Sequence, residues 1–206
     1  FSAGIDLKER RGMNADQRWA HNRTLNDVCE RLARSQIPTI AALNGIALGG
    51  GFELALACDF RIAADHALVG LPEVSLGIVP GAGGSQRLPR LIGPTRAKEL
   101  ILTARRVSAT EALAIGLLSK VTPAGQLMDA ARELALQIAR NSPLAVAYAK
   151  AAIDNALDMS LEQGLRYETA AIRAMLASDD YQIALAAFAE KRTPEFPPLS
   201  ARRVVS

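Results

Sequence analysis

The spacing of hydrophobic and polar residues changes about half-way along the chain. Up to about Arg106, short apolar runs suited to buried strands alternate with amphipathic stretches, and the connections between them are short. Strands are predicted at 38–43, 60–63 and 67–70, and a long helix is predicted at 15–34. Such alternation of strands and helices is typical of an α/β layout.

The second half of the chain has the pattern of a helical region. The stretches Ser108–Glu111 and Ser160–Gln163 have the spacing of a capping box, and Pro143 stands where the first turn of a helix tolerates proline. One apolar stripe in this half is formed by Leu161, Leu165, Ile172 and Leu176. We therefore predict an α/β core at 1–106 and a mainly helical region with its tail at 107–206.

A run of three glycines, Gly49–Gly51, leads directly into an apolar helix that carries Glu53 near its start. Ordered glycine costs conformational entropy, so three in succession suit a sharp turn where bare backbone approaches another group closely. The first turn of the following helix supplies unpaired N–H groups and a partial positive charge. Such a turn can hold an anion, or an oxygen that becomes anionic during a reaction.

Two glutamates stand in apolar surroundings, each near a glycine-rich turn. Glu53 is followed by the apolar set 54–58, and Glu73 lies in the mostly apolar stretch 70–80, which runs into the second glycine-rich turn at 78–84. A glutamate early in a helix can simply favour the helix dipole, and one beside a proline can belong to a surface turn. A carboxylate in apolar company is costly unless it is paired or functional. We therefore favour a pair of carboxyl groups that share general acid–base work.

Composition excludes several other classes of protein. The chain has 206 residues, half of them hydrophobic, which is enough for one substantial core. Its 24 basic and 21 acidic residues are interspersed and leave a net charge of +3, so a nucleic-acid partner is not expected. No apolar run approaches the length of a membrane span, and no phosphate loop, dinucleotide fingerprint or nucleophile elbow is present.

The remaining residues of chemical interest have structural interpretations. His21 and His66 lack partners at ligand spacing, so no metal site is predicted. Cys29 and Cys58 are isolated from each other in the sequence, which favours reduced thiols over a disulfide. The chain begins at Phe1 with what looks like the end of a strand, so we expect a preceding segment that this sequence does not include.

Four blocks of the sequence resemble the crotonase (enoyl-CoA hydratase/isomerase) superfamily, and together they cover essentially the whole chain. The blocks are FSAGIDLKE at 1–9, PTIAALNGIALGGGFELALACDFRIA at 38–63, LPEVSLGIVPGAGGSQRLPRLIG at 71–93 and AFAEKRTPEF at 187–196. Several long blocks in the right order are more specific than one short motif. The resemblance implies an α/β fold, a crotonase-like spiral of ββα units followed by a C-terminal helical region that forms trimers, often paired into hexamers.

The resemblance also implies a site for an acyl-CoA thioester. The family binds the thioester carbonyl in an oxyanion hole of two backbone N–H groups, which fall here on Ala3 and Gly50. Its catalytic glutamates fall on Glu53 and Glu73. Further substrate-binding positions fall on Gly4, Ile5, Asp6, Gly81, Phe188 and Lys191, the last two in a patch that reaches the coenzyme A of a neighbouring subunit. Coenzyme A is part of the substrate, so neither a cofactor nor a metal is expected.

Because both glutamates are present, the resemblance favours an enoyl-CoA hydratase of fatty-acid β-oxidation. Such an enzyme adds water in syn fashion across the C2=C3 bond of a 2-enoyl-CoA and gives 3-hydroxyacyl-CoA. Glu53 would activate the water and Glu73 would protonate C2. We expect a homotrimer or a dimer of trimers, in the cytoplasm or in the mitochondrial matrix of a eukaryote.

One alternative is a methylglutaconyl-CoA hydratase of leucine breakdown, which the blocks DLKER, ELALACD, RLPRLIG and AKELI resemble. Animal members of that branch also bind AU-rich RNA. An enoyl-CoA isomerase is a further alternative, less favoured because isomerases of the family commonly retain only the second glutamate.

Overall fold

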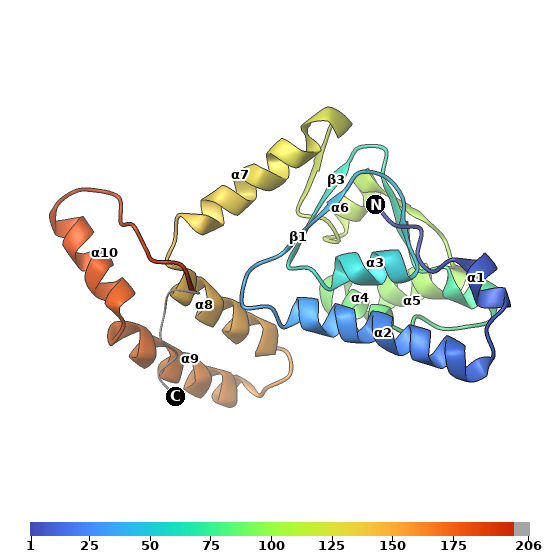
Figure 1. Cartoon of the computed structure of the whole chain (residues 1–206), viewed down its shortest axis with the longest axis horizontal. Helices are drawn as coiled ribbons and strands as arrows, with labels where there is room; N and C mark the ends of the chain where they lie inside the picture. The colour runs from blue at the N-terminus through green and yellow to red at the C-terminus, as the bar shows by residue number, and fades with distance from the viewer. Residues whose placement is uncertain (200–206) are drawn as a thin grey trace. The chain divides into compact units, whose positions relative to one another are not determined.

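The computed structural model describes residues 1–199 and shows two compact units. The first unit comprises Phe1–Ser35 and Thr39–Arg132, and the second comprises Gln36–Pro38 and the chain from Glu133 onward. Both are drawn in Figure 1. Residues 200–206, the end of the predicted helical region, lie outside the described part of the chain.

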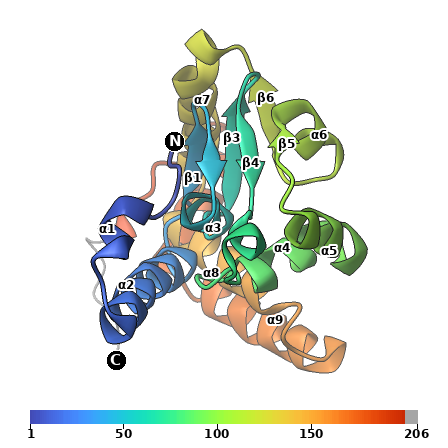
Figure 2. The same ribbon diagram turned by 90° about the vertical axis from the view of Figure 1, so that its right-hand side faces the viewer.

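The strands of the first unit form two small sheets (Figure 2). One sheet is parallel, in the order β1 (Ile40–Leu43), β3 (Phe60–Ala64) and β6 (Lys120–Thr122). The other pairs β2 (Ala47–Leu48) in parallel with β4 (Leu68–Gly70), which pairs antiparallel with β5 (Val107–Ser108). The three predicted strands are thus confirmed as β1, β3 and β4, with β1 starting two residues later than expected.

The helices of the first unit are short apart from α2. In chain order they are α1 (Leu7–Arg11), α2 (Ala15–Ala33), α3 (Gly50–Leu56), the 3₁₀ turn η1 (Glu73–Leu76), α4 (Gly84–Ile92), α5 (Pro94–Thr103), α6 (Ala109–Ala114) and the 3₁₀ turn η2 (Ala124–Gln126). The predicted helix at 15–34 is confirmed as α2, whose N-terminus is closed by a capping box between Asn14 and Gln17. Helix α3 packs against both α2 and α4 (Figure 1).

The hydrophobic core of the first unit lies between the strands and helices α3–α6. Its largest fully buried side chains are Leu43, Phe52, Val69, Leu71, Leu88, Val107 and Leu117. Phe52 stands one residue before Glu53 in α3, so burial of its ring holds the start of that helix against the core. Because α6 and β6 also join this core and these sheets, the first unit continues beyond residue 106, to Arg132.

The second unit is helical. Helix α7 (Leu127–Ala139) runs into it from the first unit, and it continues with α8 (Pro143–Asn155), α9 (Leu161–Leu176) and α10 (Asp179–Ala189) (Figure 1). The capping box predicted at Ser160–Gln163 is confirmed, and Pro143 occupies the first turn of α8 as expected. Buried Asp180 accepts a hydrogen bond from the Ser142 hydroxyl and ties the start of α10 to the start of α8.

The capping box predicted at Ser108–Glu111 forms only in part. The Ser108 hydroxyl accepts a hydrogen bond from the Glu111 N–H at 3.2 Å. The Glu111 carboxylate, however, accepts two hydrogen bonds from the Arg105 guanidinium, at 2.7 and 3.1 Å. A charged, bidentate partner is stronger than a neutral backbone donor, and it draws the carboxylate away from the helix start.

Candidate active site

The glycine turn joins β2 to α3 with a backbone that other residues rarely adopt. Gly49 has φ 54° and ψ −131°, and its N–H donates to the Gly70 carbonyl at 3.0 Å, which ties the turn to β4. A Cβ atom at Gly49 would lie 3.2 Å from Oε1 of Glu73. The bare backbone of the turn therefore passes directly beside the second candidate glutamate.

The N-terminal segment lies against the same turn. Ser2 forms an isolated parallel bridge to β2, consistent with the strand end predicted there. A Cβ atom added to Gly51 would lie 2.3 Å from the Ser2 carbonyl oxygen, and one added to Gly4 would lie 3.3 Å from the Gly50 nitrogen. Among residues 1–199, none accepts a hydrogen bond from the N–H of Ala3 or of Gly50. Two unused donors thus lie on adjoining segments, as an oxyanion hole requires.

Glu53 lies in the first turn of α3, is only 3% exposed, and has one carboxylate oxygen fully engaged. Its Oε1 accepts hydrogen bonds from the N–H groups of Ala82, at 2.7 Å, and Gly84, at 2.9 Å. An N–H group can only donate, so Oε1 acts as an acceptor and a proton on Glu53 would sit on Oε2. No described residue donates to Oε2. That oxygen is free to exchange a proton with a bound molecule.

Glu73 is the first residue of η1 and is held quite differently. Its side chain is buried, and Oε2 has no hydrogen-bond partner among the described residues. Burial raises the pKa of Glu73 from 4.5 to about 7, and the nearby charge of Glu53 adds to the rise, against a lowering by its own backbone N–H. A carboxyl group with this pKa is protonated in a large fraction of molecules at neutral pH and can act as an acid.

A turn with two free N–H donors and two carboxyl groups of unlike environment suits enolate chemistry on a thioester. The family model described as enoyl-CoA hydratase/isomerase matches residues 1–198. This chain belongs to the enoyl-CoA hydratase/isomerase family. The predicted membership and the crotonase-like fold are confirmed by this match and by the solved structures that the chain resembles.

Individual relatives of this family member are similar over most of its length. The Bacillus subtilis protein YngF, whose name assigns it to the enoyl-CoA hydratases/isomerases, is 50% identical over 192 residues, 93% of this chain and 74% of that protein. The mitochondrial methylglutaconyl-CoA hydratase of Mus musculus is 45% identical over 200 residues, 95% of this chain and 64% of that protein. The crystal structure of an enoyl-CoA hydratase from Bacillus anthracis superposes with a TM-score of 0.92 at 52% identity, covering 94% of this chain and 75% of that one.

The structure places the other predicted positions of this hydratase/isomerase family member in two groups. Gly4, Ile5 and Asp6 continue the N-terminal segment beside the glycine turn, and Asp6 caps α1 by accepting the Lys8 N–H at 2.8 Å. Gly81 opens the loop 81–84 that supplies both donors to Glu53. These residues therefore lie around one site, although their contacts with substrate stay predictions.

Phe188 and Lys191 belong to the second unit. Phe188 is the last residue but one of α10 and has 84% of its surface exposed, and exposed Lys191, beyond the end of that helix, has φ 56°. Their predicted contact with the coenzyme A of a neighbouring subunit stays a prediction.

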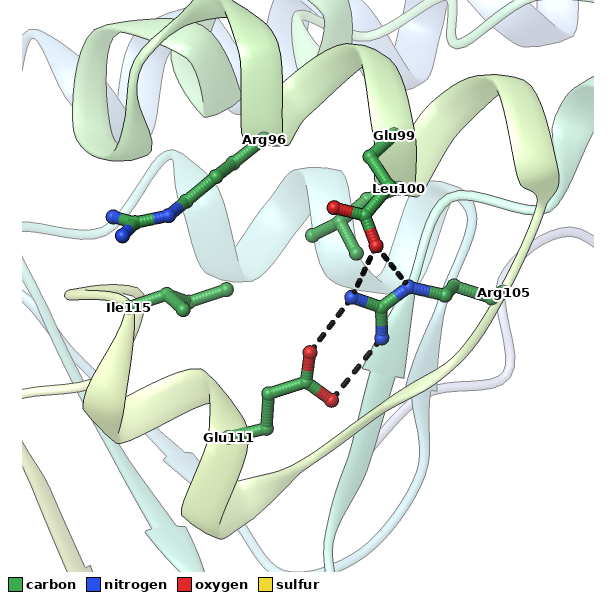
Figure 3. A pocket seen from close by; sticks show the side chains of 6 residues that line it. All are labelled: Arg96, Glu99, Leu100, Arg105, Glu111 and Ile115. Atoms are coloured by element: carbon green, nitrogen blue, oxygen red, sulfur yellow. Dashed lines mark hydrogen bonds and ion pairs between the residues drawn. The ribbon is translucent and has the colours of Figure 1, made fainter.

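Two hollows on the first unit are lined by neither Glu53 nor Glu73. One of about 80 Å³ is lined by Arg96, Glu99, Leu100, Arg105, Glu111 and Ile115 (Figure 3). Arg105 there pairs with both Glu99 and Glu111, which raises the pKa of Arg105 and lowers that of Glu111. The positive charge of Arg105 is compensated by these two carboxylates, and the three side chains join α5 to α6. The other hollow, about 580 Å³, is lined by Asp27, Glu30, Arg31 and Arg34.

Metal-binding side chains do not gather at this site. Within residues 1–199 no group of three or more His, Cys, Asp or Glu side chains could hold a metal ion, and none of the helices there could cross a membrane. Cys29 and Cys58 are free thiols, and burial raises the pKa of Cys29 to about 11. A thiol with that pKa is not a nucleophile at neutral pH.

Sequence reasoning missed the residues that hold Glu53 and its loop, among them Asn22 of α2. Its side-chain amide donates to the Gly81 carbonyl at 3.0 Å. The only signal in the sequence is an amide in the middle of an amphipathic helix, which does not identify its partner 59 residues away.

Proposed function

We propose that this protein is an enoyl-CoA hydratase that adds water across the C2=C3 bond of a 2-enoyl-CoA to give 3-hydroxyacyl-CoA. The observation that carries the proposal is the unlike environment of the two buried glutamates. Glu53 is held as an acceptor by two N–H groups with one oxygen free, whereas Oε2 of Glu73 has no partner among the described residues and Glu73 has a pKa of about 7. Glu53 therefore suits the role of base and Glu73 the role of acid.

In the proposed reaction Glu53 acts as the base and Glu73 as the acid. The thioester carbonyl accepts hydrogen bonds from the N–H groups of Ala3 and Gly50. Glu53 Oε2 takes a proton from water as the water oxygen bonds to C3, and the C2=C3 electrons move toward the carbonyl as an enolate. Glu73 then gives its proton to C2, and a proton passes from Glu53 to Glu73 to restore both groups. Losing one N–H donor to the enolate oxygen would cost about 3 kcal/mol of barrier.

Hydration of crotonyl-CoA, followed by the loss of its enoyl-thioester absorbance, tests the proposal. Glu53→Gln and Glu73→Gln should each lower kcat by about 10²-fold or more, because each removes a group that transfers a proton. KM should change little. Glu99→Gln is the matched control, since exposed Glu99 lies outside the site in a surface pair of small energetic value. A near-normal rate in either test variant would contradict the two-carboxylate mechanism.

The resemblance to the mouse methylglutaconyl-CoA hydratase supports a narrower candidate, hydration of a branched acyl-CoA. A panel of short, long and branched enoyl-CoA esters separates the two candidates. Turnover of 3-methylglutaconyl-CoA without turnover of crotonyl-CoA would favour the branched substrate. Conversion of a 3-enoyl-CoA to its 2-enoyl isomer would favour isomerisation. Salt-sensitive retention of an AU-rich oligonucleotide would indicate RNA binding, which the dispersed charge does not favour.

We also propose that the chain assembles as a homotrimer or a dimer of trimers through its second unit. The apolar stripe predicted on α9 is largely uncovered in the single chain. Its exposed fractions are 80% for Leu161, 54% for Leu165, 53% for Ile172 and 49% for Leu176. A second copy of this chain would remove that surface from water. Fatty-acid β-oxidation, in the cytoplasm or the mitochondrial matrix, is the process in which we place the reaction.

A further inference from the structure

The loop 81–84, which holds Glu53, is itself held from helix α2. Asn22 donates its Nδ2–H to the Gly81 carbonyl at 3.0 Å. The fit is close, because a Cβ atom at Gly81 would lie 2.8 Å from both terminal atoms of the Asn22 side chain. The amide of Asn22 therefore rests directly on the backbone of the loop.

A second contact joins the same helix to the next residue of the loop. The side chain of Ala82 is fully buried, in a small apolar cluster with Cys29 of α2 and Ala57, which follows α3. Cys29 and Asn22 are seven residues (29 − 22) apart, or about two helical turns, so they lie on the same face of α2. That face holds the loop through one polar and one apolar contact.

From the other side, the loop is held by α4. The Arg87 guanidinium donates to the Ala82 carbonyl at 2.8 Å. The carbonyls of Gly81 and Ala82 are thus both occupied by side chains, while the N–H groups of Ala82 and Gly84 point to one oxygen of Glu53. A displacement of the loop must lengthen those two hydrogen bonds or move the carboxylate with it.

We propose that Asn22 is a positioning residue for the hydration reaction and acts through Glu53. By holding the Gly81 carbonyl, its amide keeps the N–H groups of Ala82 and Gly84 on Glu53 Oε1 and so aims Oε2 at the reacting water. This inference rests on the proposed function, because the role of Glu53 in catalysis does.

The test compares Asn22→Leu with Asn26→Leu, a matched change one turn later on α2. Asn26 is half-buried like Asn22, and its side chain has no hydrogen bond to a described residue. The apolar contact between Cys29 and Ala82 remains in both variants, so both should fold. If Asn22→Leu does not fold, Asn22→Asp takes its place, since a carboxylate has a similar shape but cannot donate to a carbonyl.

The first measurement is amide hydrogen exchange of the loop 81–84, which does not depend on the reaction catalysed. Exchange should be about tenfold faster in the Asn22 variant and unchanged in the Asn26 variant, because loss of the Asn22–Gly81 hydrogen bond frees the loop to open. Equal exchange in both variants would contradict the inference that the Asn22–Gly81 hydrogen bond holds the loop.

The second measurement is kinetic. With crotonyl-CoA, the Asn22 variant should lose about tenfold to a hundredfold in kcat, as a slightly misplaced base does, while KM stays within about twofold. In a Glu53→Gln background the same change should have no further effect on the residual rate. An equal loss in both backgrounds would show that Asn22 acts independently of Glu53 and would overturn the inference. Absence of hydration by the unaltered protein would instead refute the proposed function. The exchange comparison would then still show whether Asn22 holds the loop 81–84.

Discussion

Glu53 and Glu73 carry the same functional group, but the two carboxyl groups have different hydrogen-bond partners in the folded protein. Both side chains are nearly excluded from solvent, with 3% and 7% of their surface exposed. Glu53 receives two backbone N–H groups on one oxygen, whereas Glu73 has one oxygen without any partner among the described residues. Burial without compensation disfavours the ionised form, which is why the pKa of Glu73 rises.

Replacing Glu73 by glutamine should therefore stabilise the protein in a pH-dependent way. The pKa of Glu73 is raised from 4.5 to about 7 on folding, so its ionisation costs stability as the pH rises through this window. Glu73→Gln lacks this cost. Its free energy of unfolding should exceed that of the unaltered protein by an amount that grows to about 3 kcal/mol between pH 4.5 and 8. Urea unfolding at several pH values measures the difference, and a constant difference across the range would contradict the raised pKa.

The same pKa predicts how activity depends on pH. Glu73 must be protonated to act as the acid in hydration, so kcat/KM should fall as the pH rises above about 7. Initial rates with crotonyl-CoA at low concentration between pH 6 and 9 give the profile. A kcat/KM that rises through this range would mean that Glu73 is needed in its ionised form.

At the scale of elements, the site is made where the N-terminal segment, the glycine turn and the loop 81–84 meet around the start of α3. Within the turn, Gly49 takes up the positive φ, and Gly51 leaves room for the backbone of Ser2. The length of α3, seven residues, is too short for a stable isolated helix, so its position depends on Phe52 and the core beneath it.

Replacing Gly51 by alanine should destabilise the protein, whereas the same replacement at an uncrowded glycine should not. In Gly51→Ala the new methyl group would meet the Ser2 carbonyl oxygen, a backbone atom, at 2.3 Å. The N-terminal segment must then shift, with a stability loss of about 1–3 kcal/mol and a large loss of hydration. Gly164→Ala in α9 meets nothing within 4 Å and should instead stabilise the fold by about 0.5–1 kcal/mol. Thermal unfolding of the two variants checks this contrast, which equal effects would contradict.

At the scale of the whole molecule, the two units bury their apolar residues to different extents. The first unit has a continuous core, whereas helices α8 and α9 have no buried residue in the single chain. A helical unit with such exposed apolar faces is expected to be covered by another copy of the chain.

Assembly is tested by placing a charge on the exposed stripe. Leu165→Glu should dissociate the expected trimer into monomers, because about 1.5–3 kcal/mol of burial per subunit is lost and an unpaired carboxylate is introduced. Arg166→Gln, on the neighbouring exposed position of α9, is the control and should leave the assembly intact. Sedimentation velocity gives the masses. A monomeric unaltered protein, or a trimer that persists in Leu165→Glu, would contradict the assembly.

Features that depend on near neighbours in the chain can be predicted from the amino-acid sequence. Apolar spacing predicted α2 and the strands β1, β3 and β4, and the capping pattern at Ser160 predicted the start of α9. The glycine run before an apolar helix, and glutamates in apolar company, identified the two buried carboxyl groups. These are local signals, because backbone preference and the cost of burying a charge are properties of a residue and its immediate surroundings.

Which of these features come into contact depends on how the whole chain folds. Hydrogen bonds from the loop 81–84 to Glu53, and from Asn22 to Gly81, join residues that are 29 to 59 positions apart. Sequence patterns describe residues close together in the chain and do not predict which distant residues form hydrogen bonds. In the same way, Arg105 diverts Glu111 from its predicted capping box, and the apolar stripe of α9 stays uncovered in the single chain. The unlike environments of Glu53 and Glu73 therefore come from contacts that folding alone creates, since burial and hydrogen-bond partners depend on three-dimensional position.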